Sequence, residues 1–246
     1  MTSKDESKDQ AAWRGKTVMV VGGSRGIGAA IVAWFAAAGA TVSFSYAGSR
    51  EAAEALAAST GARALRADAA DRDALLAAVR EAGPLDVFVY NAGLLLSGDP
   101  LTLDADAVDR LIDVNLRGAY HACVEAARRM PDGGRIIAIG SVHGDSMPFD
   151  AITAYGMSKS ALQGMARGLA RDFGARGITV NVVQPGPTDT DMNPADGPLA
   201  MKMHDQMAIR RHGTAHEVAS LVGYLASPPA RGITGAMHTI DGGFGA

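Results

Sequence analysis

Residues 18–28 of this chain read VMVVGGSRGIG, and this stretch decides how the rest of the chain is interpreted. Its first four letters form an apolar, mostly β-branched run that predicts a buried strand. Three glycines follow at the spacing G-x-x-x-G-x-G, and residues 29–35 continue in good helix formers. The pattern therefore predicts a strand, a tight turn and a helix whose free N–H groups suit a phosphate-bearing ligand.

The same turn fits a second kind of chemistry. Residues 22–26 also match G-x-S-x-G, the strained turn that presents the nucleophile of serine hydrolases. On this interpretation Ser24 is the nucleophile, and an acid and a histidine must follow at later strand ends. His143 stands near a predicted strand end, but no acidic residue is clearly placed to orient it. A hydrolase is therefore the less favoured alternative.

Length and composition are typical of one α/β domain. The chain has 246 residues, 48% of them hydrophobic, and a formal net charge of −3. This charge balance gives no electrostatic case for a nucleic acid polymer or a membrane surface as partner. A single cysteine, Cys123, and the lack of a long apolar run fit a cytoplasmic protein. We expect residues 1–12 to be a disordered arm and residues 13–246 to be the domain.

Predicted strands and helices alternate along the chain. The strand-like runs are residues 41–46, 63–66, 86–90, 135–139, 178–183 and 237–240, and the predicted helices include 102–110, 118–130, a long one ending at 173, and 201–209. Residues 186–198 predict an irregular loop. Alternation of this kind predicts a Rossmann-type, doubly wound parallel sheet with three α/β/α layers.

Polar clusters follow several of these strands. They lie at Asn91–Gly93, Ser141 and Pro185–Thr188. Ligands of parallel α/β sheets bind at the carboxyl ends of the strands, so we expect these clusters to form one site with the glycine turn.

Tyr155 and Lys159 stand four residues apart in a predicted helix and therefore share one face. A cationic ammonium near a phenol favours the phenolate and should lower the phenol pKa. A tyrosine tuned in this way exchanges a proton near neutral pH, as the interconversion of a carbonyl and an alcohol requires. Ser141, at the end of the preceding strand, is placed to bond the same substrate oxygen.

As a set, these motifs resemble the short-chain dehydrogenase/reductase family. The resemblance rests on the glycine turn, Asn91-Ala92-Gly93, Asn115, Ser141, Tyr155-x-x-x-Lys159 and Pro185-Gly186-Pro187-Thr188, which occur in the family's order. It implies that Tyr155 is the general acid/base and that Lys159 also holds the nicotinamide ribose. It implies further that Ser141 positions the substrate oxygen and that Asn115 supports a water-linked proton relay. Tyr90 departs from the asparagine that is frequent in the family.

The region after the second predicted strand suggests which nicotinamide cofactor is used. Proteins of this type that bind NAD carry an acidic residue there, whereas residues 45–50 read SYAGSR and contain no carboxylate. Arg25, Ser49 and Arg50 offer charge-assisted hydrogen bonds to a 2′-phosphate, so we expect NADP(H). Asp68 resembles the family's adenine-side aspartate, although it equally fits a cap of the turn before Asp71. The expected cofactor-binding residues are Gly22, Ser24, Arg25, Gly26, Ile27, Gly28, Tyr46, Ala47, Ser49, Arg50, Asp68, Asn91, Ala92, Gly93, Tyr155, Lys159, Pro185, Gly186 and Thr188.

The substrate is expected to be a small-molecule carbonyl compound. The segments predicted to wall its site contribute His143, Met147, Phe149 and Met192, and methionine adapts to irregular apolar shapes. The histidines show no metal-ligand spacing, so no metal is expected. Many family members reduce 3-oxoacyl groups on acyl carrier protein. Residues 130–133 replace the more basic turn common in those enzymes, which favours a free ketone or aldehyde.

Two further expectations follow from likeness to family members. Residues 46–49, 121–128, 160–173, 182–187 and 234–246 are similar to a cyclic di-GMP-binding branch, which implies ligand sequestration as an alternative function. The family likeness also implies a homotetramer. Ser160, Gly164 and Gly168 form a stripe of small residues that would let another helix approach, and residues 242–246 are expected at a second interface.

Overall fold

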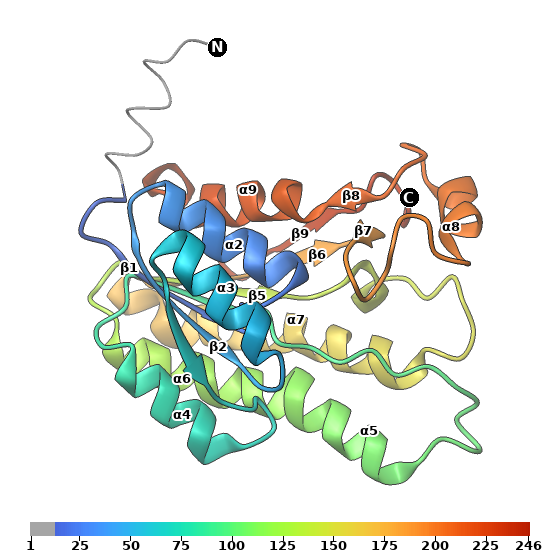
Figure 1. The fold of residues 1–246 in the computed structure, drawn as a ribbon, viewed down its shortest axis with the longest axis horizontal. Coiled ribbons are helices and arrows are strands. Elements are labelled where there is room, and N and C mark those ends of the chain that lie inside the picture. Colours follow the sequence, from blue (N-terminus) through green and yellow to red (C-terminus); the bar gives the residue numbers. More distant parts are fainter. Residues whose placement is uncertain (1–12) are drawn as a thin grey trace.

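The computed structural model describes residues 13–246, so the predicted arm at residues 1–12 lies outside the described residues. A seven-stranded, wholly parallel sheet runs through the centre (Figure 1). Its strands, in spatial order, are β3 (Arg63–Arg66), β2 (Thr41–Tyr46), β1 (Thr17–Val21), β4 (Val87–Tyr90), β5 (Arg135–Ile139), β6 (Thr179–Pro185) and β9 (Met237–Ile240). The winding direction reverses between β1 and β4, which leaves a crevice at their carboxyl ends.

Helices cover both faces of the sheet. One face carries α2 (Gly26–Ala37), α3 (Arg50–Thr60) and α9 (Ala215–Ala226), and the other carries α4 (Arg72–Glu81), α5 (Ala105–Ile112), α6 (Ala119–Arg129) and α7 (Thr153–Phe173). Two separate apolar cores result, because the side chains of each strand alternate between the faces. The predicted three-layer Rossmann-type fold is confirmed.

An aromatic cluster anchors the α2 and α9 side. Trp13 and Trp34 meet edge to face with ring centroids 6.0 Å apart, and each also packs edge-on against Phe35. Helix α9 approaches this cluster through Gly223, where a Cβ would lie 2.3 Å from the Trp34 ring. The glycine therefore allows the close packing of α9 on α2.

The two helices predicted at 102–110 and 118–130 are one continuous helical segment. A π-helical turn, η1 (Asp113–Gly118), joins α5 directly to α6. Gly118 keeps helical backbone angles instead of ending the helix, and its missing Cβ leaves room for Tyr90, whose Oη would lie 2.6 Å from it. The Tyr90 hydroxyl donates a hydrogen bond of 2.5 Å to the Val114 carbonyl inside this turn.

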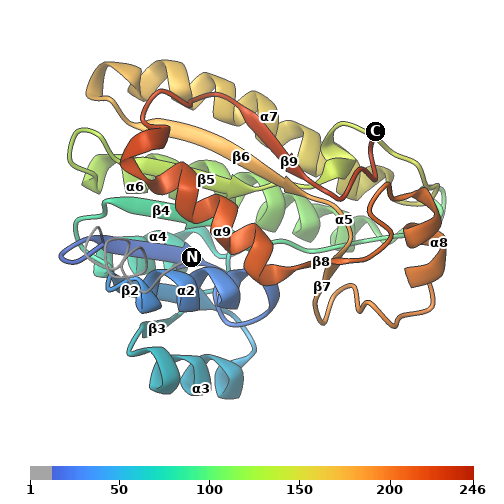
Figure 2. The same ribbon diagram turned by 90° about the horizontal axis from the view of Figure 1, so that it is seen from above.

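The chain leaves the sheet after β6 and returns at α9. Strand β7 (Thr188–Asp189) pairs in parallel with β8 (Gly213–Thr214), and helix α8 (Ala200–Gln206) lies between them in sequence. Figure 2 shows all three together beyond one end of the sheet. The irregular loop predicted at 186–198 therefore contains a short strand, and the helix predicted at 201–209 is shorter.

Short 3₁₀ turns complete the described chain. They are η2 (Val142–Gly144), η3 (Gly174–Arg176) and η4 (Pro228–Ala230). None of the helices within residues 13–246 has both the length and the apolar character needed to cross a membrane.

Candidate active site

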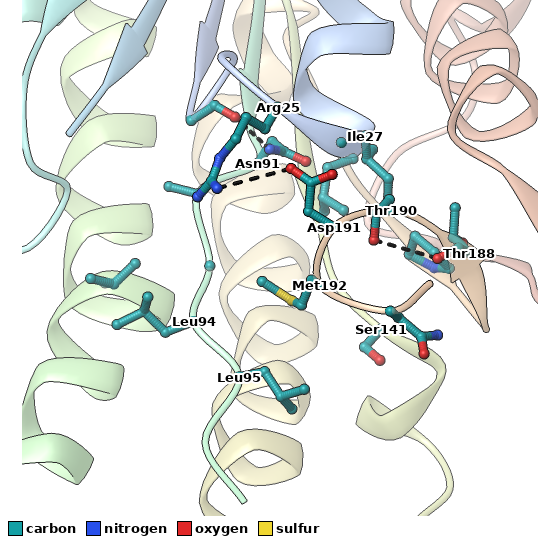
Figure 3. Close-up of a pocket in the computed structure, with 18 of the residues that line it drawn as sticks. Arg25, Ile27, Asn91, Leu94, Leu95, Ser141, Thr188, Thr190, Asp191 and Met192 are labelled. Atoms are coloured by element: carbon teal, nitrogen blue, oxygen red, sulfur yellow. Dashed lines mark hydrogen bonds and ion pairs between the residues drawn. The ribbon is translucent and has the colours of Figure 1, made fainter. Parts of the chain in front are cut away.

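A cavity of about 680 Å³ opens at the carboxyl ends of the central strands (Figure 3). Twenty of the predicted site residues line it: Gly22, Ser24, Arg25, Gly26, Ile27, Tyr46, Ala47, Ser49, Asp68, Asn91, Ala92, Gly93, Ser141, His143, Tyr155, Lys159, Pro185, Gly186, Thr188 and Met192. Five others, Gly28, Arg50, Asn115, Met147 and Phe149, do not. The strand topology thus brings together residues that lie far apart in the sequence.

The glycine turn is held in place by its neighbours. Gly22 has a φ of +77°, and a Cβ there would lie 2.7 Å from the Ala92 backbone. The Asn91 amide donates to the Gly22 carbonyl at 2.7 Å, and a Cβ on Gly28 would collide with the same carbonyl. Gly28 therefore supports the turn from behind the cavity wall.

The turn delivers the N-terminus of α2 to the cavity. No side chain caps this helix, and its first turn contains no acidic residue. The uncapped N–H groups and the positive end of the helix dipole are suited to a pyrophosphate. The shape and the donor set of this cradle therefore fit a dinucleotide.

The two arginines expected to read a 2′-phosphate occupy different places. Arg25 lines the cavity and points across its mouth toward Asp191, 3.9 Å away (Figure 3). Arg50 is turned away and pairs at 2.7 Å with Glu54, four residues later in α3. Arg50 does not line the cavity in this structure, because a local helical ion pair holds it, and its contact with a 2′-phosphate stays a prediction.

Asp68 caps its turn and lines the cavity, and its contact with the adenine side of the cofactor stays a prediction. One carboxylate oxygen accepts from the Ala70 N–H at 3.0 Å, and the other pairs with Arg110 at 2.8 Å. Burial opposes ionisation of Asp68, but the hydrogen bonds from Arg110 and Ala70 outweigh it and lower its pKa. Arg110 also lines the cavity. No sequence motif pointed to it.

Lys159 and Tyr155 face each other on α7 as predicted, but their pKa values do not move as predicted. The Lys159 ammonium lies 5.7 Å from the centre of the Tyr155 ring and donates to the Ile139 carbonyl at 2.9 Å. Burial lowers the pKa of Lys159 to about 8. Burial also raises the pKa of Tyr155, and a hydrogen bond with Ser141 opposes that rise. The expected lowering of the phenol pKa is therefore wrong here, because desolvation outweighs the other effects.

Asn115 sits behind the cavity, inside the π-helical turn. Its Oδ1 accepts from the Leu94 N–H at 2.7 Å, and its Nδ2 donates to the Leu94 carbonyl and to Ser158 Oγ. Ser158 belongs to α7, beside Lys159. Asn115 therefore ties the loop after β4 to the helix that carries Tyr155 and Lys159. A π turn at such a position is frequent at functional sites.

The substrate end differs from the expectation at two residues. His143 and Met192 line the cavity, whereas Met147 packs against Gly156 of α7 and is 47% exposed. Phe149 lies behind His143 and Phe244, with ring centroids at 6.4 and 5.8 Å. Both belong to the loop before α7, whose path has no periodic signal in the sequence.

The C-terminal tail supplies a wall that the sequence did not predict. Phe244 is buried against Val142 and Met207 of the same chain, and it lines the cavity. Asp241 shapes this turn by accepting hydrogen bonds from the Gly243 and Gly245 N–H groups. The sequence feature that could have indicated this wall is the single aromatic residue among the glycines of residues 242–246, which read GGFGA. The other unpredicted lining residues include Leu94, Leu95, Thr190, Asp191, Asn193 and Leu199.

The hydrolase alternative finds no support in this geometry. In residues 13–246 Ser24 forms no hydrogen bond to a histidine. His143 Nδ1 contacts the Ser146 carbonyl at 3.2 Å and not a carboxylate. Ser24 therefore has no base to activate it.

Comparisons with known proteins agree with the site. A family profile described as enoyl-(acyl carrier protein) reductase matches residues 21–245. The cyclic-di-GMP-binding biofilm dispersal mediator protein of Escherichia coli (strain K12) is 61% identical over 235 residues, covering 96% of this chain and 99% of the relative. The 3-oxoacyl-[acyl-carrier-protein] reductase MabA of Mycobacterium tuberculosis (strain ATCC 25618 / H37Rv) is 38% identical over 237 residues, with 94% and 93% covered. The crystal structure of BdcA in complex with NADPH superimposes with a TM-score of 0.94 at 61% identity, covering 96% of both chains.

Proposed function

Because this chain belongs to the short-chain dehydrogenase/reductase family, we propose that it is an NADP(H)-dependent oxidoreductase acting on a small-molecule ketone or aldehyde. The observation that carries this proposal is the convergence of Ser141, Tyr155 and Lys159 on one cavity with the glycine turn. Folds of this class host many chemistries, so the side chains of the site, and not the fold, support the reaction type.

The cavity offers a place for each part of the cofactor. The uncapped start of α2 suits the pyrophosphate, and the stretch from Tyr46 to Ser49 carries no carboxylate to repel a 2′-phosphate. Arg25 and Ser49 both line the cavity, as does Arg110, which is paired with Asp68. Lys159, at the far end, suits the nicotinamide ribose. The NADPH complex of BdcA, at 61% identity, supports NADP(H) as the cofactor.

The reaction is assigned to residues at the opposite end of the cavity. When bound, NADPH supplies the hydride. Tyr155, whose raised pKa keeps it protonated at neutral pH, donates the proton from Oη to the substrate oxygen. Ser141 Oγ bonds the same oxygen and stabilises the charge that develops on it. The Lys159 ammonium favours the phenolate that remains, and Asn115 holds α7 and the Leu94 loop in register.

Replacement of the acid tests this assignment. Tyr155→Phe should reduce NADPH oxidation with a panel of ketones and aldehydes by roughly 10²–10⁴-fold, because no other group donates the proton. Fluorescence titration should show that NADPH still binds, since the ring is kept. Full turnover in Tyr155→Phe would exclude the proposed role of this residue.

Binding of cyclic di-GMP is a second candidate function. It rests on the 61% identity to a protein named for binding that nucleotide. We rank it second because the site retains Ser141, Tyr155 and Lys159, which sequestration does not need. Calorimetric titration of the full chain with cyclic di-GMP, with and without saturating NADPH, tests it. Heat that NADPH abolishes places both ligands in one cavity, and absence of heat in both titrations rejects this candidate.

A further inference from the structure

His143 is a polar group of the substrate end that the proposed proton transfer leaves without a task. It is the middle residue of the 3₁₀ turn η2, which follows Ser141, and its backbone N–H donates to Ser141 Oγ at 3.2 Å. Three aromatic rings surround it edge-on. The centroids of Phe149, Tyr155 and Phe244 lie 6.4, 6.2 and 6.0 Å from the imidazole centroid. The imidazole is therefore fixed in orientation beside the proposed acid.

One contact determines which imidazole nitrogen carries the proton. His143 Nδ1 lies 3.2 Å from the Ser146 carbonyl oxygen, which can only accept a hydrogen bond. Nδ1 must therefore be the protonated nitrogen. Burial lowers the pKa of His143 and outweighs the Ser146 contact, so the imidazole is neutral at pH 7. Nε2 is left with a lone pair.

Nothing in the described part of the chain satisfies that lone pair. His143 Nε2 has no hydrogen-bond partner within residues 13–246, yet it is not among the fully buried unsatisfied atoms. Since His143 lines the cavity, this nitrogen is an acceptor that a bound molecule can reach. The surroundings are apolar, because Val142, Met207 and Phe244 form a buried cluster on which Met203 also packs.

The polar groups near the reacting position thus have complementary roles. The Ser141 and Tyr155 hydroxyls donate to a carbonyl oxygen, whereas His143 Nε2 offers an acceptor to a donor elsewhere on the same molecule. A substrate without such a donor would displace water from Nε2 and leave it unpaired. An unpaired buried acceptor weakens binding by about 10- to 100-fold.

We propose that His143 determines substrate specificity by accepting, at Nε2, a hydrogen bond from a hydroxyl that the substrate carries close to its reacting carbonyl. The preferred substrate class is therefore hydroxy ketones or hydroxy aldehydes with an apolar remainder. This inference rests on the proposed reductase function, because it assigns a second contact to the same substrate.

The test compares matched substrates on the full chain with NADPH. A series of 1-hydroxy-2-alkanones is paired with 1-fluoro-2-alkanones of the same length. Fluorine is close to the hydroxyl in size but cannot donate a hydrogen bond. Because it withdraws electrons more strongly, the contact is measured as the change in the hydroxy-to-fluoro ratio of kcat/KM between the wild type and a His143 variant. Loss of the hydrogen bond should lower this ratio by about 10- to 100-fold.

Variants separate a specific contact from a general defect. His143→Phe should lower the ratio of kcat/KM for the hydroxy ketone to that for the fluoro ketone by this factor. His143→Gln, which offers an amide oxygen, should restore most of the preference. Phe149→Leu is the matched control, because it alters the wall of the imidazole without touching Nε2 and should keep the ratio. NADPH fluorescence titration checks that each variant is folded.

The outcomes distinguish this inference from the function on which it rests. An unchanged hydroxy-to-fluoro ratio in His143→Phe would overturn the role of His143 and leave the reductase standing. Failure of the wild type to reduce any pair would overturn the reductase proposal, and the inference with it.

Discussion

Lys159 is the residue at which stability and chemistry oppose each other. Its buried ammonium has the Ile139 carbonyl as hydrogen-bond partner, and burial lowers its pKa from 10.5 to about 8. Between these two values the unfolded chain binds more protons than the native one, so stability rises with pH there. Below pH 8 Lys159 is charged in both states, and the native state carries the full cost of burying this charge. A shift of this size corresponds to roughly 3 kcal/mol.

Lys159→Met should therefore stabilise the protein while it abolishes reduction. At pH 7 we expect the free energy of unfolding to rise by about 1–3 kcal/mol, because the gain from removing a buried charge exceeds the cost of leaving the Ile139 carbonyl without its donor. Urea denaturation at pH 7 and pH 10 measures this, and the gain over wild type should shrink at pH 10. Lys202→Met, at an exposed position, is the control. A Lys159→Met protein less stable than wild type at pH 7 would contradict the argument.

Tyr90 links strand β4 to the π-helical turn η1, a connection that the sequence pattern does not predict. Its hydroxyl donates to the Val114 carbonyl within η1, the turn that also contains Asn115. Burial raises the pKa of Tyr90, so the hydroxyl remains a donor at all physiological pH values. A π turn leaves a backbone carbonyl without its usual helical partner, and this tyrosine supplies a replacement.

Tyr90→Phe should loosen this part of the helix. We expect the free energy of unfolding to fall by about 1–3 kcal/mol, because the Val114 carbonyl loses its donor in a buried place. We also expect kcat to fall several-fold with little change in NADPH affinity, since Asn115 follows Val114 directly. Denaturation and steady-state kinetics are the measurements. Tyr224→Phe, on the exposed side of α9, is the control, and unchanged kcat and stability in Tyr90→Phe would refute the coupling.

Elements were predictable from sequence where local pattern and tertiary pairing agree. The bounds of β2, β3, β5 and β9 coincide with the strand-like runs predicted from the sequence, because each run pairs in parallel along its full length. Strands β7 and β8 have two residues each and pair across a long excursion, so no periodicity announces them. The π turn depends on a contact between Tyr90 and a distant helix, which local pattern does not contain.

At the scale of the whole molecule, the cofactor end of the site was predictable and the substrate end was not. The carboxyl ends of parallel strands must meet at one sheet edge, so the glycine turn, Asn91 and Ser141 were bound to converge. The substrate wall instead comes from α8 and from Phe244 in the tail, which pack through tertiary contacts alone. Arg50 lies outside the cavity wall because it pairs with Glu54 one helical turn away.

We propose that the protein is a homotetramer and that the face of α7 bearing Gly164 and Gly168 packs against a second copy. A Cβ built on Gly164 or Gly168 would meet nothing within 4 Å in the described protomer, so packing within it does not require these glycines. A helix of a second copy would require them. Gly164→Leu should therefore shift the molecular mass measured by analytical ultracentrifugation to smaller species. Gly232→Leu, also in open space, is the control, and an intact tetramer in Gly164→Leu would exclude α7 from the interface.

The aromatic cluster beneath α9 makes the chain's intrinsic fluorescence a local probe. The chain has two tryptophans, and Trp13 and Trp34 both belong to this cluster on the α2 side of the sheet. Their emission therefore follows the loosening of α2 from α9, whereas circular dichroism averages over all helices. A difference between the two unfolding curves would show that the half of the molecule bearing Tyr155 opens separately from the half bearing the glycine turn.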